Sequence, residues 1–311
     1  MLYYKINKSK GKFSYGDFEV YTKTQKSDHY INYHFVFTEE ESKSELEFNG
    51  GTNDGANQRT YRIIGADLVE KTANGFKEKM QLLQQGELEF AYLESGAGDF
   101  VGGFHGDEVM DSAELCADGK TIDLFNECEL QSCNELVFLL TAKMFRCNSD
   151  SRQVNNHVLK YTIKSDGEIE LDQSVEWLVN NLKIDKAMLC MLTIYRCDVQ
   201  NNRVTDILKY HKWDNDICDI IDTGDFDADS NLIKNCSYSG QGYVIAYGKN
   251  NGIFAKAGYK SIAGIKGEFN NYCWVRPFGD NKTYFSANNG ATVKCGDFWH
   301  WINYYKLDYL F

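Results

Sequence analysis

The chain has 311 residues, of which 43% are hydrophobic and 25% charged, so it can bury a large core. Acidic residues outnumber basic ones by 45 to 33, and the formal net charge of −12 argues against nucleic acid and anionic membranes as partners, because both are bound by basic faces. No apolar run reaches about 18 residues, so no transmembrane helix is expected.

Proline occurs once, at Pro277, against 26 Gly, 20 Tyr and 19 Phe. This composition predicts aromatic-rich strands joined by turns of Gly, Asn and Asp. Near the N-terminus, apolar and β-branched residues alternate over 18–22 and 31–35, which is typical of half-buried strands. Residues 67–81 are the best candidate for a short helix, although Asn74-Gly75 interrupts them.

Alternation returns at 87–95, which predicts a strand that leads into the glycine-rich loop 98–109. Residues 135–146 read as a second strand, apolar enough to be buried. Residues 157–179 predict a hairpin whose turn is Ser165-Asp166-Gly167.

Another buried strand is expected at 186–197, and a hairpin at 243–259 with its turn at 249–252. An aromatic segment, 296–311, closes the chain. Many short strands with little helix predict an all-β fold, a β-sandwich of jelly-roll type with minor helix. We expect a single domain over 1–311 with loop insertions.

The ten cysteines include no CxxC pair and match neither a zinc site nor a compact disulfide scaffold. Cys190, within the apolar run AMLCMLTI, is typical of a buried free thiol. The polar N-terminus lacks the apolar core of a signal peptide. We therefore expect a protein made in the reducing cytoplasm, either kept there or released as part of a phage particle.

Candidate chemistry concentrates in the loop 98–109, GDFVGGFHGDEV, which places His105, Asp107 and Glu108 among three glycines. A histidine beside carboxylates suits proton transfer. The same three side chains could bind Mn or Zn, although no further ligand is identifiable. If the segment is a strand, Asp107 and Glu108 face opposite sides of it.

Three segments resemble, in order, the motifs of β-jelly-roll polysaccharide lyases of the alginate-lyase and heparin-lyase-I kinds. They are QRTYR (58–62), GGFHG (102–106) and IFAKAGYK (253–260). The sequence departs from the family pattern where Phe104 replaces Ile and Gly103 replaces Gln. In addition, Tyr259 follows Gly258 directly, a shift of one residue that turns a strand side chain to the other face.

The resemblance implies β-elimination on a uronic-acid-containing glycan. Arg62 would neutralise the sugar carboxylate, His105 would remove the C5 proton, and Tyr259 would protonate the leaving oxygen. The residues expected to contact substrate are Lys256, Glu108, Asp107, His157 and Tyr161, of which the last two could replace Tyr259. The implied partner is a polysaccharide or oligosaccharide, with no cofactor, and the oligomeric state stays open.

Glycoside hydrolysis is a second reading, with Glu108 as one carboxylate and Glu94 or Asp111 as the other. A non-catalytic glycan-binding or structural module, such as a phage tail component, is the third. Its stacking rings would come from the C-terminal segment, namely Trp299, Trp301, Tyr304 and Tyr305.

Calcium is an open question at Asp225, Asp227 and Asp229, which have the 1-3-5 spacing of an EF-hand loop. The sixth position is Ser230 and the twelfth is Cys236, so the usual glycine and bidentate glutamate are missing. A solvated acidic loop is the alternative.

Overall fold

A computed structural model describes most of the chain, and its described residues form almost nothing but strands. The described residues are 1–8, 15–40, 58–84, 88–147, 152–198, 200, 202–212, 217–222, 232–237, 242–275 and 279–311. The calcium candidates Asp225, Asp227 and Asp229 lie outside them.

The strands form one hydrogen-bonded network that folds over into two layers. The first layer runs, in spatial order, β10 (Cys128–Cys133), β1 (Leu2–Ile6), β2 (Phe18–Lys23), β3 (His29–Glu40), β4 (Gln58–Thr72), β5 (Gly75–Gln84), β14 (Leu182–Tyr195), β21 (Asp280–Val293), β20 (Glu268–Val275) and β17 (Leu232–Ser237).

The second layer runs β9 (Lys120–Ile122), β8 (Glu108–Ala117), β11 (Glu135–Phe145), β12 (Gln153–Lys164), β13 (Glu168–Trp177), β22 (Phe298–Tyr309), β19 (Ile253–Ala263), β18 (Gly242–Tyr247), β15 (Ile207–Lys212) and β16 (Ile217–Asp222). Two short strands complete the fold: β6 (Ala91–Glu94) pairs with β14, and β7 (Phe100–Gly102) pairs with β6.

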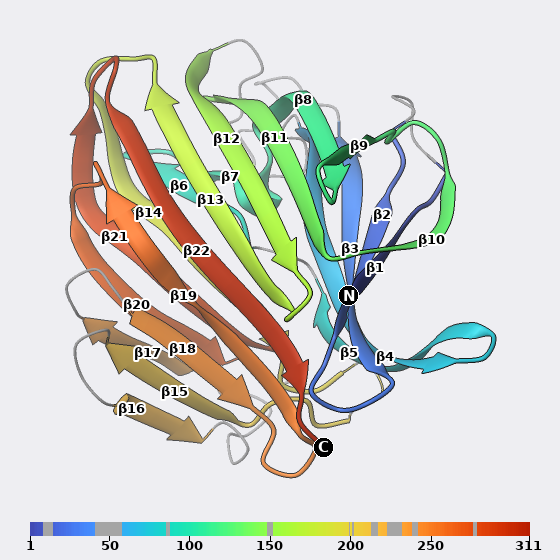
Figure 1. The fold of residues 1–311 in the computed structure, drawn as a ribbon. Helices are drawn as coiled ribbons and strands as arrows, with labels where there is room; N and C mark the ends of the chain where they lie inside the picture. The colour runs from blue at the N-terminus through green and yellow to red at the C-terminus, as the bar shows by residue number, and fades with distance from the viewer. Residues whose placement is uncertain are drawn as a thin grey trace.

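The two layers meet at one short parallel pairing, where Gln58 and Arg59 of β4 lie opposite Glu108 and Val109 of β8. Every other ladder between the described strands is antiparallel. Figure 1 shows β11, β12, β13, β22 and β19 side by side across the front of the molecule, with β6 and β7 behind them.

Aromatic side chains fill the space between the layers. Phe138 of β11 has its ring centroid 5.0 Å from that of Phe18 and 5.2 Å from that of Tyr61, both in the other layer. Farther along, the Trp301 indole of β22 donates to the Leu189 carbonyl of β14 at 2.9 Å. These contacts make the fold an all-β sandwich, as the sequence predicts.

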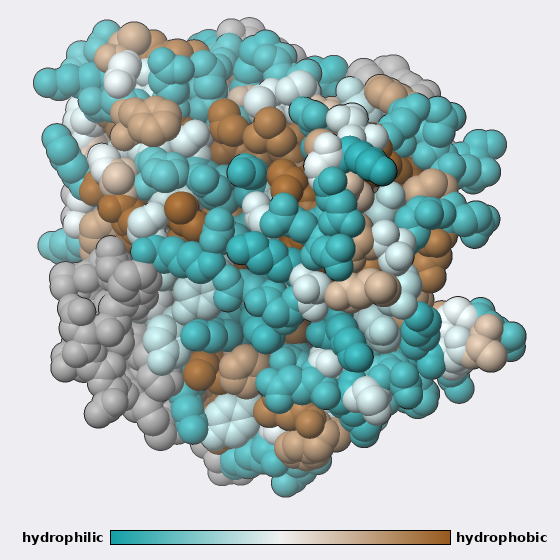
Figure 2. All heavy atoms as spheres, viewed as in Figure 1, coloured by the Kyte–Doolittle hydropathy of each residue, from teal (hydrophilic) through white to brown (hydrophobic). Residues whose placement is uncertain are grey.

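The outward faces of the strands carry mainly polar side chains. In β13, for example, buried and partly exposed residues alternate along most of the strand. Figure 2 shows the outer surface on this side as largely hydrophilic, with hydrophobic side chains in separate patches. The period-2 alternation read from the sequence therefore marks the inner and outer faces correctly.

The hairpins predicted at 157–179 and 243–259 are confirmed as β12–β13 and β18–β19. The helix expected over 67–81 is wrong, because this segment spans the ends of β4 and β5. A two-residue turn, Ala73-Asn74, connects them, and Thr72 pairs with Gly75. Pairing of β4 with β3 along its whole length overrides the local helical pattern.

The glycine-rich loop contains a short 3-10 turn, Gly103–His105. No helix among the described residues has the length and apolar character needed to cross a bilayer. The jelly-roll connectivity is not confirmed, and the single domain over 1–311 stays a prediction.

We expect Phe138→Ala to lower the free energy of unfolding by about 3–5 kcal/mol. The ring contacts both layers, and its removal leaves a cavity between them. Urea denaturation followed by circular dichroism measures this loss. Phe298→Ala removes an exposed ring and should change the free energy by less than about 0.5 kcal/mol. Equal losses in the two variants would contradict the assignment of Phe138 to the core.

Candidate functional site

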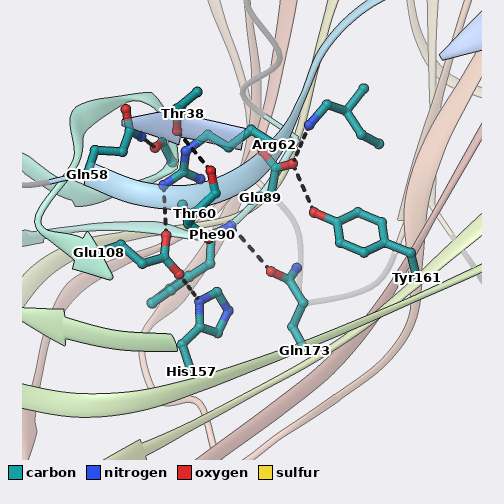
Figure 3. A network of polar contacts seen from close by, with 12 residues as sticks. Thr38, Gln58, Thr60, Arg62, Glu89, Phe90, Glu108, His157, Tyr161 and Gln173 are labelled. Carbon is teal, nitrogen blue, oxygen red and sulfur yellow. Dashed lines mark hydrogen bonds and ion pairs between the residues drawn. The ribbon is translucent and has the colours of Figure 1, made fainter. Parts of the chain in front are cut away.

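An ion network joins the two layers inside the sandwich. Arg62 of β4 donates from Nη2 to Glu108 Oε2 at 2.8 Å, and Glu108 Oε1 lies 2.7 Å from Nδ1 of His157 on β12 (Figure 3). The side chains are 2%, 1% and 0% exposed, respectively. The β4–β8 pairing places Glu108 beside β4, so the arginine reaches its partner across the junction of the layers.

A second group of polar side chains lies next to this network. Glu89 Oε1 accepts hydrogen bonds from the Tyr161 hydroxyl at 2.9 Å and from the Ile63 amide at 3.1 Å. Gln173 Oε1 accepts from the Phe90 amide at 3.3 Å. Figure 3 shows these groups converging from β4, β12 and β13 around the segment that precedes β6.

The two buried glutamates have opposite electrostatic environments. Burial alone would raise the pKa of Glu108, but the charge of Arg62 and the hydrogen bond from His157 lower it to about 2. Burial dominates at Glu89 and raises its pKa, against the pull of Arg62 and of the two groups that donate to it. Glu108 is therefore held as a carboxylate, whereas Glu89 tends toward the neutral acid.

Several polar atoms of this interior have no hydrogen-bond partner. They are Nε of Arg62, Nε2 of His157, Oε2 of Glu89 and Nε2 of Gln173. An unmatched buried polar atom costs about 1–3 kcal/mol, so the pairs that do form are important for stability. A polysaccharide in solution does not reach these side chains in the closed sandwich, which gives them a structural role in joining the layers.

Glu108→Gln should lower the free energy of unfolding at neutral pH by about 3–5 kcal/mol, because it leaves the Arg62 charge buried without a counter-charge. The Glu108 contribution is complete above the ordinary carboxyl pKa near 4.5 and is lost as the pH falls through about 2. Wild-type protein should therefore lose stability over this window, and Glu108→Gln should lose less. Urea titrations at a series of pH values measure both effects.

Glu89→Gln is the matched control, because the amide oxygen can still accept from Tyr161 and Ile63. Because the pKa of Glu89 is raised in the folded protein, the protonated side chain contributes to stability at low pH. This contribution is lost as the pH rises and the side chain ionises. At neutral pH this variant should be as stable as wild type or more so. A loss as large as that of Glu108→Gln would show that the two sites do not differ as described.

His105 lies outside this interior, at the end of the 3-10 turn. Its Nδ1 is 2.9 Å from Asp99 Oδ1, and the side chain is 31% exposed. The Phe100 ring packs on the imidazole with a centroid separation of 5.2 Å. Partial burial would raise the pKa of Asp99, but the hydrogen bond from His105 and the Phe100 amide lower it.

The expectation that Asp107 and Glu108 face opposite sides of a strand does not apply here, because only Glu108 belongs to a strand. Asp107 precedes β8 and has a positive φ of 56°, so strand alternation does not apply to it. Both side chains are buried. His157 and Tyr161 do share one face, and it is the inner face of β12.

Tyr259 and Lys256 occupy opposite faces of β19. Tyr259 is 2% exposed and its ring contacts Phe285 of the other layer at a centroid distance of 5.1 Å. The Lys256 ammonium lies on the outer face, 4.2 Å from the centroid of the Tyr243 ring and 5.2 Å from that of Tyr304. Burial lowers the pKa of Lys256. The structure thus brings Arg62, Glu108 and His157 together and places His105, Tyr259 and Lys256 in three other settings.

A surface cleft of about 220 Å³ is lined in part by Gly98, the residue that precedes Asp99. It is lined by Glu94, residues 95–98, Arg146, Cys147 and Arg152. The Cys147 thiol donates to the Asp99 carbonyl at 3.4 Å, which connects the wall of the cleft to the loop that holds His105.

Glu94 fixes one arginine of the cleft. Its Oε2 accepts from Arg146 Nε at 2.5 Å, and its Oε1 accepts from the Cys147 amide at 3.2 Å. Glu94 is buried, whereas the Arg146 side chain is 42% exposed. The guanidinium is therefore anchored on one side and open to solvent on the other, an arrangement suited to a carboxylate.

Sequence reasoning missed Asp99, Arg146 and Glu89. Asp99 lies inside the glycine-rich loop 98–109. Its separation from His105 along the sequence did not indicate that the two side chains pair. A usable signal existed for Glu89, an acid within the apolar segment LEFAYL. Within the described ranges, no group of three or more His, Cys, Asp or Glu side chains has the geometry of a metal site.

No known family matches the sequence, and no curated protein matches it. Twenty-four solved chains match the structure. One is a GH36 alpha-galactosidase, AgaA from Geobacillus stearothermophilus, in complex with 1-deoxygalactonojirimycin, with a TM-score of 0.45, 10% identity, and coverage of 94% of this chain and 41% of that chain.

Two further matches are more distant. The heparan sulfate lyase HepC from Pedobacter heparinus has a TM-score of 0.36 and 7% identity over 93% of this chain and 36% of that one. A GalM/aldose epimerase homologue from C. elegans has a TM-score of 0.34 and 8% identity over 94% and 100%. The chain spans about two fifths of the length of the galactosidase.

Proposed function

We propose that the protein cleaves an acidic polysaccharide by β-elimination at the cleft beside the glycine-rich loop, with His105 as the base. The observation that carries this proposal is the partly exposed His105–Asp99 pair, in which Asp99 directly follows Gly98 in the wall of a cleft that two arginines also line. The roles differ from those implied by the lyase resemblance, because Arg62 and Tyr259 lie in the interior.

The pairing with Asp99 orients the imidazole. A carboxylate at Nδ1 favours the tautomer with its proton on that nitrogen, which leaves Nε2 as the basic nitrogen. Histidine is the side chain most often used as a general base in proton transfer. Asp99 therefore supplies orientation and stabilises the imidazolium that forms.

The arginines of the cleft provide the second requirement of the reaction. A C5 proton becomes acidic when the neighbouring carboxylate is neutralised, and a guanidinium can do this with two parallel hydrogen bonds. Arg146 is fixed for this role by Glu94, and Arg152 lines the same cleft. The volume of the cleft is smaller than that of a site for a drug-sized ligand, which is about 300–1,000 Å³. The cleft would therefore hold about one sugar residue of a longer polysaccharide.

The reaction then balances with one acid–base residue. His105 takes the C5 proton, the C4–C5 double bond forms, and the C4–O bond breaks. The protonated imidazole returns the proton to the leaving glycosidic oxygen. The products are an unsaturated uronate and a new hydroxyl end, with no oxidant or cofactor required.

Incubation with alginate, pectate, hyaluronan and heparan sulfate should produce ultraviolet absorbance from the unsaturated uronate with at least one polymer. We expect His105→Gln to reduce the rate by about 100-fold or more, since it removes the general base. Asp99→Asn should reduce kcat and shift its pH profile.

His300→Gln is the matched control. His300 lies 2.7 Å from Asp172 on the outer face of the sandwich, with exposure similar to that of His105. This variant should retain the full rate. No absorbance with any of the polymers rules out the elimination, and new reducing ends without absorbance would indicate hydrolysis instead.

Arg146→Ala should raise KM for an acidic oligosaccharide by about 10- to 100-fold, because a hydrogen bond between charged groups contributes about 1.5–3 kcal/mol. Arg146→Lys keeps the positive charge but loses the planar guanidinium that can donate two parallel hydrogen bonds. Its KM should lie between those of wild type and Arg146→Ala. Lys143→Ala, on the outer face of β11 shortly before Arg146, is the control and should leave KM unchanged. Saturable binding without turnover would favour the glycan-binding module.

A further inference from the structure

The tip of the glycine-rich loop presents an exposed aromatic ring. Phe104 is the middle residue of the 3-10 turn between Gly103 and His105, and it is 53% exposed. A single exposed hydrophobic side chain is ordinary on a protein surface. Phe104 differs from the other exposed hydrophobic side chains because it lies in the glycine-rich loop, next to His105.

Hydrogen bonds on both sides hold the loop. Gly102 donates from its amide to the Gly106 carbonyl at 2.7 Å, and the buried Gln58 side chain donates to the Gly103 carbonyl at 3.1 Å. The Phe145 amide donates to the Asp107 carbonyl at 2.9 Å. The ring of Phe104 is therefore carried by a fixed backbone.

The backbone of this loop adopts conformations that only a few residues tolerate. The φ angles are 79° at Gly102, 55° at Gly103, 81° at Gly106 and 56° at Asp107. A Cβ on Gly102 would lie 2.3 Å from Met144 Cε and 2.7 Å from the Phe90 carbonyl oxygen. Left-handed conformations at a residue such as Asp107 cost about 1–3 kcal/mol and concentrate at ligand-binding segments.

We propose that Phe104 is the platform on which a pyranose ring of the substrate stacks, next to His105. The inference deepens the proposed function and rests on it for the nature of the ligand. The C–H face of a sugar packs on an aromatic ring, and the adjacent residue in the turn is the base. A ring stacked on Phe104 would extend the substrate beyond the cleft lined by Arg146.

The platform acts on binding and takes no part in proton transfer. Phe104→Ala should weaken binding of the best-bound uronate oligosaccharide by about three- to tenfold and leave kcat unchanged. Phe104→Tyr keeps the ring and should restore the affinity. Isothermal titration and initial-rate kinetics measure the two quantities.

Phe125→Ala is the matched control, because Phe125 is an exposed phenylalanine in a different turn. Phe104→Ala and Phe125→Ala should both keep the wild-type melting temperature, which excludes misfolding. An affinity of Phe104→Ala within about twofold of that of Phe125→Ala overturns the platform. So does a failure of wild-type protein to bind any oligosaccharide derived from the four polymers.

The outcomes separate this inference from the proposed function. Affinity that depends on the Phe104 ring, with no ultraviolet absorbance from any polymer, supports the platform and rejects the elimination. Elimination that depends on His105, with an unchanged KM in Phe104→Ala, supports the reaction and rejects the platform.

Discussion

The charge of Arg62 is the constraint on which the arrangement of the two layers depends. A guanidinium stays charged at any physiological pH, and burial without a counter-charge would cost several kcal/mol. Its partner Glu108 belongs to β8 and the next residue in the network, His157, belongs to β12. The layers are therefore held together by a contact that tolerates little sliding, in addition to the aromatic packing around Phe138.

The same contact supports the surface loop. Glu108 is the first residue of β8, three positions after His105 in the chain. Asp107 joins them in a left-handed conformation with its side chain buried. A buried ion network at one end of the loop, and the Gln58 contact at its centre, leave His105 and Phe104 at a defined place on the surface.

The sequence was sufficient to predict the strands and the sandwich, but it did not show which polar side chains pair with one another inside it. Ser165-Asp166-Gly167 and the turn at 249–252 predict hairpins because glycine accepts positive φ, and both hairpins are present. Arg62 and His157 look like other polar residues in alternating strands. The pairing of Arg62 with Glu108 depends on a β4–β8 contact between residues 46 positions apart in the chain. The helix at 67–81 failed because propensity is local, whereas β4 is fixed by β3.

The position of β14 has a consequence for how the chain reaches this structure. This strand contacts β5 and β6 on one side and β21 on the other, and Leu192 and Thr283 in that ladder are 91 residues apart. Hairpins close within microseconds, but strands so distant must first overcome the entropy of closing a long loop. Refolding should therefore be slow, and intermediates with β14 unpaired would expose an edge prone to aggregation.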